Sequence, residues 1–556
     1  MKIQRLIITL GVAALVSACG HTIPPVGDAA HDAAAARAQV MAEQARKASR
    51  PSLRPRAFMA SPPMGAPAPL VIQQEVDREQ YASIEDNPVK RVAEQPVSTF
   101  SIDVDTGAYA NVRRMLMEGR LPPSDAVRIE ELVNYFSYAD PAPADETPFR
   151  VNMEFGPNPW NARTHLLRVA IKARQVETAA LPPANLVFLV DVSGSMHAQD
   201  KLPLLKRSLN LLARELDGDD KVSIVVYAGA SGVVLEPTPG DQAAAIEQAL
   251  AQLQAGGSTN GGEGIRLAYA KARESFIDGG INRVLIATDG DFNVGTVDHQ
   301  ALLDLVERER EAGISLTTLG FGRGNYNDHL MEQLADHGNG NHAYIDSLLE
   351  ARKVLVEQMG GTLHTLAKDV KIQIEFNPAR VSEYRLIGYE NRLLAREDFN
   401  NDQVDAGEVG AGHSVMALYE VALVGEGGER IEPLRYANAA PAADPGSHEL
   451  AFVRLRYKQP DQSHSRLLSY PLHADDKLAS LAQTSDDYRF SAAVAAFGQK
   501  LRGGKYLQGF DYGRIIELAR ASRGDDRHGY RSDFLRIAGL AQSLQPQAPR
   551  VADGAE

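Results

Sequence analysis

Short apolar runs alternate with segments of helical periodicity between residues 181 and 364. Each run has the length of a buried strand, and the segments between the runs carry apolar residues three and four positions apart. Strands that alternate with helices in this way predict a doubly wound parallel sheet, an α/β fold of the Rossmann-like class. Such sheets bind ligands where the carboxyl ends of the strands meet, so we expect a site at this edge. The clearest runs are 186–190, 222–227, 284–288 and 314–321.

Polar residues follow two of these runs at the point where each strand should end. The first run ends in Asp191, Ser193 and Ser195, which place one carboxylate and two hydroxyls on a single turn. A glycine-rich loop further along contains Thr259, and another run ends at Asp289. Carboxylate and hydroxyl oxygens are hard ligands that suit Mg²⁺ or Mn²⁺ better than a soft metal. We therefore expect these side chains to form a metal site at the carboxyl edge of the sheet.

The spacing Asp-x-Ser-x-Ser, with a distal Thr and a distal Asp, resembles the metal-ion-dependent adhesion site (MIDAS) of the von Willebrand factor type A (VWA) family. Residue by residue, the pattern falls on Asp191, Ser193, Ser195, Thr259 and Asp289. The resemblance implies that these side chains and water molecules hold a Mg²⁺ or Mn²⁺ ion. It also implies that a protein partner donates an Asp or Glu carboxylate to the open position of the ion, and we expect a binding protein and not an enzyme.

Segments on both sides of the predicted VWA domain resemble the regions that accompany this domain in a family of bacterial envelope proteins. Residues 98–138 resemble the amino-terminal VWA-associated region of that family. Motifs within residues 387–413 resemble its carboxyl-terminal domain of unknown function. Together the resemblance covers residues 98–544, but the flanking matches carry no known chemistry.

Alternating polar and apolar residues outside the VWA domain predict half-buried antiparallel strands. The alternation occurs on both sides of the domain, over residues 165–173 and 370–376. We therefore expect a β-sandwich built from both flanks, with the VWA domain inserted between its strands, and helices over 488–500 and 512–521 closing the chain. The expected organisation is a signal peptide (1–18), a disordered Ala- and Pro-rich linker (19–95), an N-terminal region (96–180), the VWA domain (181–364), a β-rich C-terminal domain ending in helices (365–545) and a disordered tail (546–556).

The beginning of the chain resembles a lipoprotein signal. Lys2 and Arg5 precede an apolar stretch over residues 6–16, which is too short to span a bilayer. The stretch ends in Val-Ser-Ala-Cys, similar to a bacterial lipoprotein cleavage box, and Cys19 is the only cysteine of the chain. We expect Cys19 to carry a lipid that anchors the protein to the outer membrane of a Gram-negative bacterium, facing the periplasm. An ordinary secretory signal with an incidental cysteine is the alternative.

Three further groups of polar residues have simpler interpretations than a metal site. Asp103 and Asp105 lack the spacing of a calcium loop and fit an alternating strand over 98–106. A second group matches no standard metal loop and fits a polar hairpin connection; it consists of Asp398, Asp402, Asp405 and Glu408. A third group should be solvated on the loop after the strand 314–321, where it could contact a partner; it consists of Asn325, Asn327, Asp328 and His329.

Charge and motifs narrow the possible functions. The net charge of −14 at pH 7 argues against nucleic acid as a partner. The sequence contains no His-Glu-x-x-His, Walker or Gly-x-Ser-x-Gly motif, so no motif supplies the general base or nucleophile of a hydrolase. We therefore favour metal-dependent binding of a protein partner. A metal-dependent hydrolase, and a structural envelope protein in which the cation is only a staple, are the alternatives.

Overall fold

The computed structural model describes residues 78–545, apart from 178–179, 291–298, 437–447 and 461. The predicted signal peptide, the lipid acceptor Cys19, most of the predicted linker and the tail after residue 545 lie outside the described residues. Among the helices of the described part, none combines the length and the apolar character that a membrane crossing requires.

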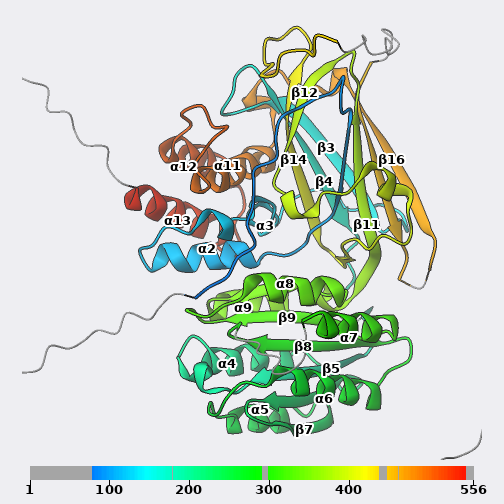
Figure 1. Ribbon diagram of the computed structural model, residues 1–556, viewed down its shortest axis with the longest axis vertical. Coiled ribbons are helices and arrows are strands. Elements are labelled where there is room, and N and C mark those ends of the chain that lie inside the picture. Colours follow the sequence, from blue (N-terminus) through cyan, green and yellow to red (C-terminus); the bar gives the residue numbers. More distant parts are fainter. Residues whose placement is uncertain (1–77, 178–179, 291–298, 437–447, 461, 546–556) are drawn as a thin grey trace, which may run out of the picture. The chain divides into compact units, whose positions relative to one another are not determined.

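The central sheet has six strands in the order β10-β9-β8-β5-β6-β7 (Figure 1). Five strands are parallel, and the edge strand β7 is antiparallel to β6. This confirms the predicted α/β class and adds one antiparallel edge strand to the parallel sheet. The strands are β5 (Ala184–Asp191), β6 (Lys221–Tyr227), β7 (Ser231–Pro239), β8 (Ile281–Thr288), β9 (Ser315–Phe321) and β10 (His342–Ile345).

Alternate side chains of β5 pack against two different layers of helices. Leu186 and Phe188 pack with α4, α5 and α9, whereas Val187 and Leu189 pack with α6, α7 and α8. Every residue of β5 is therefore buried, and after Asn185 at its start the strand is apolar until it ends at Asp191. The helices are α4 (Leu202–Ala213), α5 (Ala243–Gln252), α6 (Gly261–Glu274), α7 (His299–Glu311), α8 (Asp328–His337) and α9 (Leu348–Arg352), followed by a π-helical turn (Lys353–Glu357) and α10 (Met359–Leu363).

Two antiparallel sheets share one core and form a β-sandwich from both flanks of the VWA domain. Strand β4, before the domain, pairs with β14 after it (Figure 1). Strand β2 pairs with β11 in the same way. The predicted insertion of the domain between sandwich strands is confirmed. One sheet has the order β1-β12-β14-β4-β3, and the other contains β13-β11-β15-β16 with β2 beside β11. The strands are β1 (Lys90–Arg91), β2 (Val97–Ser101), β3 (Phe149–Pro157), β4 (His165–Ala173), β11 (Thr365–Phe376), β12 (Val381–Ile387), β13 (Val409–Gly410), β14 (Ser414–Leu423), β15 (Glu449–Lys458) and β16 (Ser465–His473).

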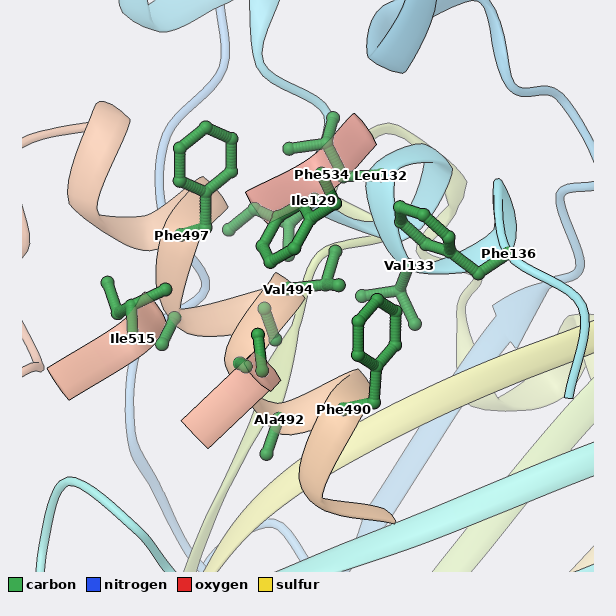
Figure 2. Close-up of a cluster of buried hydrophobic side chains, with 14 of the residues drawn as sticks. Ile129, Leu132, Val133, Phe136, Phe490, Ala492, Val494, Phe497, Ile515 and Phe534 are labelled. Carbon is green, nitrogen blue, oxygen red and sulfur yellow. The ribbon is translucent and has the colours of Figure 1, made fainter. Parts of the chain in front are cut away.

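Strands β4 and β14 are buried on both faces, so the prediction that the sandwich strands are half buried is wrong for this sheet. Leu167 and Val169 lie in the sandwich core, whereas Leu166 and Ala170 pack against a layer of helices. Figure 2 shows the centre of this layer, where phenylalanine rings of α11 and α13 meet side chains of α3. The helices are α2 (Gly107–Met117), α3 (Ile129–Asn134), α11 (Asp486–Leu501), α12 (Tyr512–Ala521) and α13 (Tyr530–Leu544); α13 follows the two helices that were expected to close the chain.

The folded body begins earlier than the sequence predicts. The N–H of Arg78 donates to the carbonyl of Gly324 at 2.8 Å, and Gln80 forms a parallel bridge with Asn327. Val92 is buried in the sandwich core. The predicted linker therefore extends too far along the chain, because its last residues, 78–95, belong to the folded body.

Candidate metal centre

Asp191 is the last residue of β5, and its side chain is fully buried. Its Oδ1 accepts a hydrogen bond from the N–H of Ser193 at 2.8 Å. Its Oδ2 accepts hydrogen bonds from the hydroxyls of Tyr227 at 3.1 Å and Thr288 at 3.0 Å. Burial raises the pKa of Asp191 to about 6, while the hydrogen bonds from Ser193 and Thr288 act in the opposite direction. The carboxylate is thus fixed in place by donors from three neighbouring segments.

The two serines of the motif bring their hydroxyls together just beyond Asp191. Ser193 precedes a 3₁₀ turn (Gly194–His197) that contains Ser195, and the two Oγ atoms are 2.9 Å apart. Two ligands at adjacent positions of an octahedral Mg²⁺, each bound at 2.0–2.1 Å, would be separated by about 2.9 Å. The two hydroxyls are hydrogen-bonded to each other, and the same separation is compatible with binding to a shared Mg²⁺.

The glycine-rich loop that contains Thr259 is attached to the Asp-x-Ser-x-Ser turn by backbone hydrogen bonds. The N–H of Gly194 donates to the carbonyl of Gly257 at 3.1 Å, and the N–H of Gly256 donates to the carbonyl of Val192 at 2.8 Å. Thr259 is partly exposed and lies two residues before α6. The structure thus places Thr259 on a loop that contacts the turn carrying the two serines.

Asp289 follows β8 directly, is fully buried, and contacts a residue that the sequence analysis missed. The ammonium group of Lys201 lies 2.9 Å from Oδ2 of Asp289 and 3.1 Å from Oδ1 of Asn325. Lys201 is the N-cap residue of α4, where the helix dipole disfavours a cation. In the sequence, Lys201 stands directly before a helix start that contains a proline. This position indicates that an acidic side chain lies near the lysine, but the sequence does not identify that side chain.

The loop after β9 is less solvated than predicted. His329 is exposed as expected, but Asp328 is 1 % exposed and pairs with the guanidinium of Arg128, which lies 200 residues away in the sequence. Burial works against the charge of Asp328, but Arg128 and His342 together outweigh it and lower the pKa of this carboxyl below its usual range. Asn327 accepts a hydrogen bond from the N–H of Leu330 at 3.2 Å and caps α8. This loop connects the candidate metal centre with the flank that precedes the domain.

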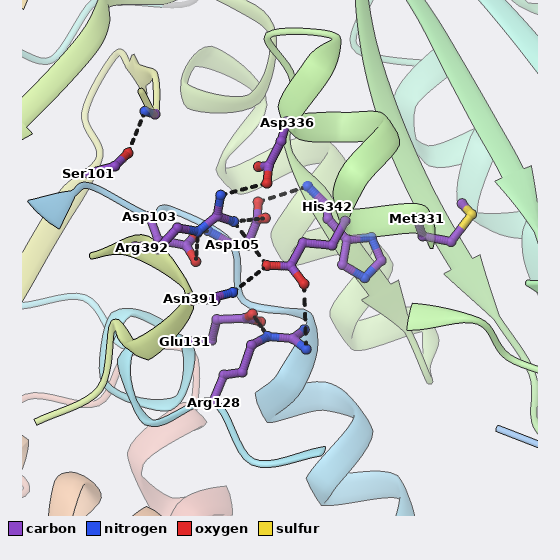
Figure 3. Close-up of polar contacts among 12 residues, drawn as sticks. Ser101, Asp103, Asp105, Arg128, Glu131, Met331, Asp336, His342, Asn391 and Arg392 are labelled. Carbon is purple, nitrogen blue, oxygen red and sulfur yellow. Dashed lines mark hydrogen bonds and ion pairs between the residues drawn. The ribbon is translucent and has the colours of Figure 1, made fainter. Parts of the chain in front are cut away.

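A second group of carboxylates lies where the VWA domain meets its flanks. Oxygen atoms of Asp103, Glu131 and Glu332 lie within 4.8 Å of one another, a spacing that could hold a metal ion. Two arginines already pair with them, as Figure 3 shows in part. Arg392 lies 3.2 Å from Asp103 and 3.1 Å from Glu332, and Arg128 pairs with Glu131. We therefore interpret this group as an ion-pair network between domains and not as a second metal site.

The other acidic residues singled out in the sequence have structural roles. Strand β2 ends at Ser101, so the predicted strand over 98–106 is too long, and Asp103 and Asp105 lie outside it. They do not lie in a calcium loop either. Oδ1 of Asp105 accepts a hydrogen bond from the N–H of His342 at 2.8 Å. The later group lies on the connection between β12 and β14, where Asp405 pairs with Arg310 of α7 at 2.6 Å.

Comparisons with known proteins agree with this architecture. The family model of the von Willebrand factor type A domain matches residues 185–358, a von Willebrand factor model matches 75–168, and the model of the C-terminal part of the uncharacterized protein YfbK matches 361–544. The uncharacterized protein YfbK of Escherichia coli (strain K12) is 48 % identical over 474 residues, which are 84 % of this chain and 81 % of the relative.

Two more distant similarities cover the VWA domain and part of its flanks. An uncharacterized protein of Synechocystis is 25 % identical over 338 residues, 59 % of this chain and 74 % of that protein. A solved structure described as von Willebrand factor type A from Catenulispora acidiphila covers 68 % of this chain and 88 % of its own, with 15 % identity and a TM-score of 0.39. VWA domains commonly bind a divalent metal ion and mediate protein–protein interactions. The identity and coverage shared with the Escherichia coli protein show that this chain belongs to the YfbK family, with a VWA domain at its centre.

Proposed function

We propose that this chain binds a protein partner through a Mg²⁺ or Mn²⁺ ion at the carboxyl edge of the VWA sheet. Asp191, Ser193, Ser195, Thr259 and Asp289 would supply or position the ligands, and an Asp or Glu of the partner would complete the coordination. The observation that carries the proposal is the pair of serine hydroxyls 2.9 Å apart beside a buried carboxylate. The donors are all oxygen atoms, as Mg²⁺ prefers.

The chemistry of the donors favours binding over hydrolysis. Two of the proposed ligands are neutral hydroxyls, so the ion would keep enough positive charge to attract an external carboxylate. A metal-dependent hydrolase needs a general base beside the ion. His197, the histidine nearest in sequence, is exposed at the end of the 3₁₀ turn, and Lys201 is paired with Asp289. A structural staple without a partner is the second alternative.

Calorimetric titration of the purified full chain with Mg²⁺ tests the metal site first. We expect the wild type to bind one ion and the Ser193→Ala/Ser195→Ala double variant to lose that binding. Ser315→Ala is the matched control, because Ser315 lies at the amino end of β9, on the opposite edge of the same sheet. Equal binding by the wild type and the double variant would refute the assignment of the ligands.

Capture from a detergent extract of the cell envelope then tests the partner. Full-length protein is used as bait with Mg²⁺, with EDTA, and as the double serine variant with Mg²⁺. A partner retained only by the wild type with Mg²⁺, and whose acidic residues are needed, supports metal-dependent binding. If the chain binds Mg²⁺ but the eluate is the same in all three cases, the ion has only a structural role. Turnover of a substrate only with metal would indicate a hydrolase.

We also propose that Cys19 carries a lipid and that the protein is held at the outer membrane, facing the periplasm. The apolar stretch followed by Val-Ser-Ala-Cys supports this proposal. Metabolic labelling with a palmitate analogue should mark the wild type and not Cys19→Ala. Labelling of both would show that the lipid is attached elsewhere, and labelling of neither would favour an ordinary secretory signal.

A further inference from the structure

Lys201 lies in a position that the fold is built to hold. Its side chain is 8 % exposed, and its ammonium group bridges Asp289 and Asn325 at 2.9 and 3.1 Å. Its aliphatic part passes over Gly322, where a Cβ atom would lie 2.2 Å from Cγ of Lys201. Gly322 also has a positive φ of 71°, which favours glycine. The loop after β9 therefore leaves room for this lysine and for no larger residue at position 322.

We infer that Lys201 is a resident counter-ion that sets the charge of the metal centre and selects an anionic ligand. The inference rests on the proposed metal site. Asp191 and Asp289 together carry a charge of −2, Lys201 carries +1, and a divalent cation adds +2. The occupied centre then has a net charge of +1, whereas without Lys201 it would be neutral. A net positive centre attracts a carboxylate, and a neutral one does so far less.

The same charge works against the metal ion. A lysine ammonium beside a proposed ligand repels a divalent cation, and it stabilises the buried Asp289 when no metal is bound. Lys201 therefore lowers the affinity of the site for the metal ion and strengthens its attraction for the carboxylate of the partner. Partners that end in a neutral amide or hydroxyl should be bound poorly, and those with an exposed Asp or Glu should be bound well.

The first test is calorimetric titration of full-length variants with Mg²⁺. Lys201→Gln keeps a hydrogen-bond donor near Asp289 but removes the charge, so the repulsion between two cations is lost and we expect Mg²⁺ to bind at least about tenfold more tightly than to the wild type. Lys201→Arg keeps the charge and should bind with the wild-type affinity. Lys271→Gln is the matched control, because Lys271 pairs with Glu236 and Glu274 near the end of α6 that lies away from the site.

The second test uses acetate as a carboxylate probe, with each variant saturated with Mn²⁺. Acetate bound next to Mn²⁺ relaxes faster in nuclear magnetic resonance, and we expect this enhancement in the wild type, in Lys201→Arg and in Lys271→Gln but not in Lys201→Gln. Circular dichroism of each variant checks that it is folded. If Lys201→Gln unfolds without metal, the comparison of Lys201→Arg with the wild type still applies, and Mg²⁺ should refold the glutamine variant.

The outcomes separate this inference from the proposed function. If the wild type binds no divalent cation, both are refuted. If the wild type binds Mg²⁺ but Lys201→Gln binds it equally or more weakly, the metal site stands and the role of Lys201 is refuted. Tighter binding of Mg²⁺ by Lys201→Gln, together with loss of the acetate effect, is the result that supports the inference.

Discussion

Arg128 connects the flank that precedes the VWA domain with the domain itself. The side chain is 2 % exposed and pairs with Glu131 of α3 and with Asp328 at the start of α8. Replacing Arg128 with Met keeps much of its apolar stem but leaves both buried carboxylates without this cation. Removal of one partner from a buried ion pair costs about 3–5 kcal/mol. His342 lies 3.4 Å from Asp328 and compensates in part, so we expect a loss near the lower value, about 3 kcal/mol.

Urea unfolding of the full chain measures this loss. Trp160 is the only tryptophan, is 5 % exposed, and lies in the helix layer that contains α3, so its fluorescence reports on this side of the junction. The control is Arg214→Met at the C-cap of α4, because Arg214 and its partner Glu247 are 63 % and 37 % exposed and such pairs contribute about 0–1 kcal/mol. A loss below about 1 kcal/mol for Arg128→Met would show that the network is not the main connection between flank and domain.

Three further predictions test other parts of the structure. Burial raises the pKa of Glu130 to about 8, so the folded state keeps a proton that the unfolded state releases, and the free energy of unfolding should fall as the pH rises from about 5 to 8. The urea midpoint should vary less with pH across this range in Glu130→Gln than in the wild type. The same variation in both proteins would contradict the assignment of this pH dependence to Glu130. Phe497→Ala in the helix layer should cost about 3–5 kcal/mol in urea unfolding, against less than about 0.5 kcal/mol for the exposed Met117→Ala, and similar losses would count against the core. Mg²⁺ at a hundred times its Kd should raise the unfolding free energy by about 2.7 kcal/mol in the wild type, whereas an equal thermal shift in the double serine variant would exclude the serines as ligands.

The α/β domain could be predicted because its central strand carries an uninterrupted apolar run, residues 186–190, which needs no long-range information to be identified. The sandwich strands are harder to read. Strand β4 alternates apolar and polar residues, yet Arg168 is buried because it pairs with Asp140 at 2.6 Å. Helix α13 carries an apolar stripe that consists partly of alanines, such as Ala538 and Ala541, and small residues give a weak periodic signal.

The candidate site shows the same division between local and distant information. The Asp-x-Ser-x-Ser turn is local, so its hydroxyl pair could be anticipated from spacing alone. Lys201 contacts Asp289 and Asn325, which lie 88 and 124 residues further along the chain, and Asp328 is buried only because Arg128 reaches it from 200 residues away. A sequence shows that a charged residue is present, but only the fold shows which distant charge allows it to be buried.

The insertion of the VWA domain also determines the order in which the protein can assemble. Strand β4 cannot pair with β14 until the chain between them has been closed into a loop, and an unfolded connection of roughly 240 residues makes this closure cost about 5 kcal/mol of chain entropy. The folded domain removes that cost, because Leu181 and Ala184 at its start line the same small cavity as Leu363 at its end. The sandwich should therefore close only after the domain between its strands has folded. A substitution deep inside the VWA domain would then delay the formation of a sheet that it never contacts.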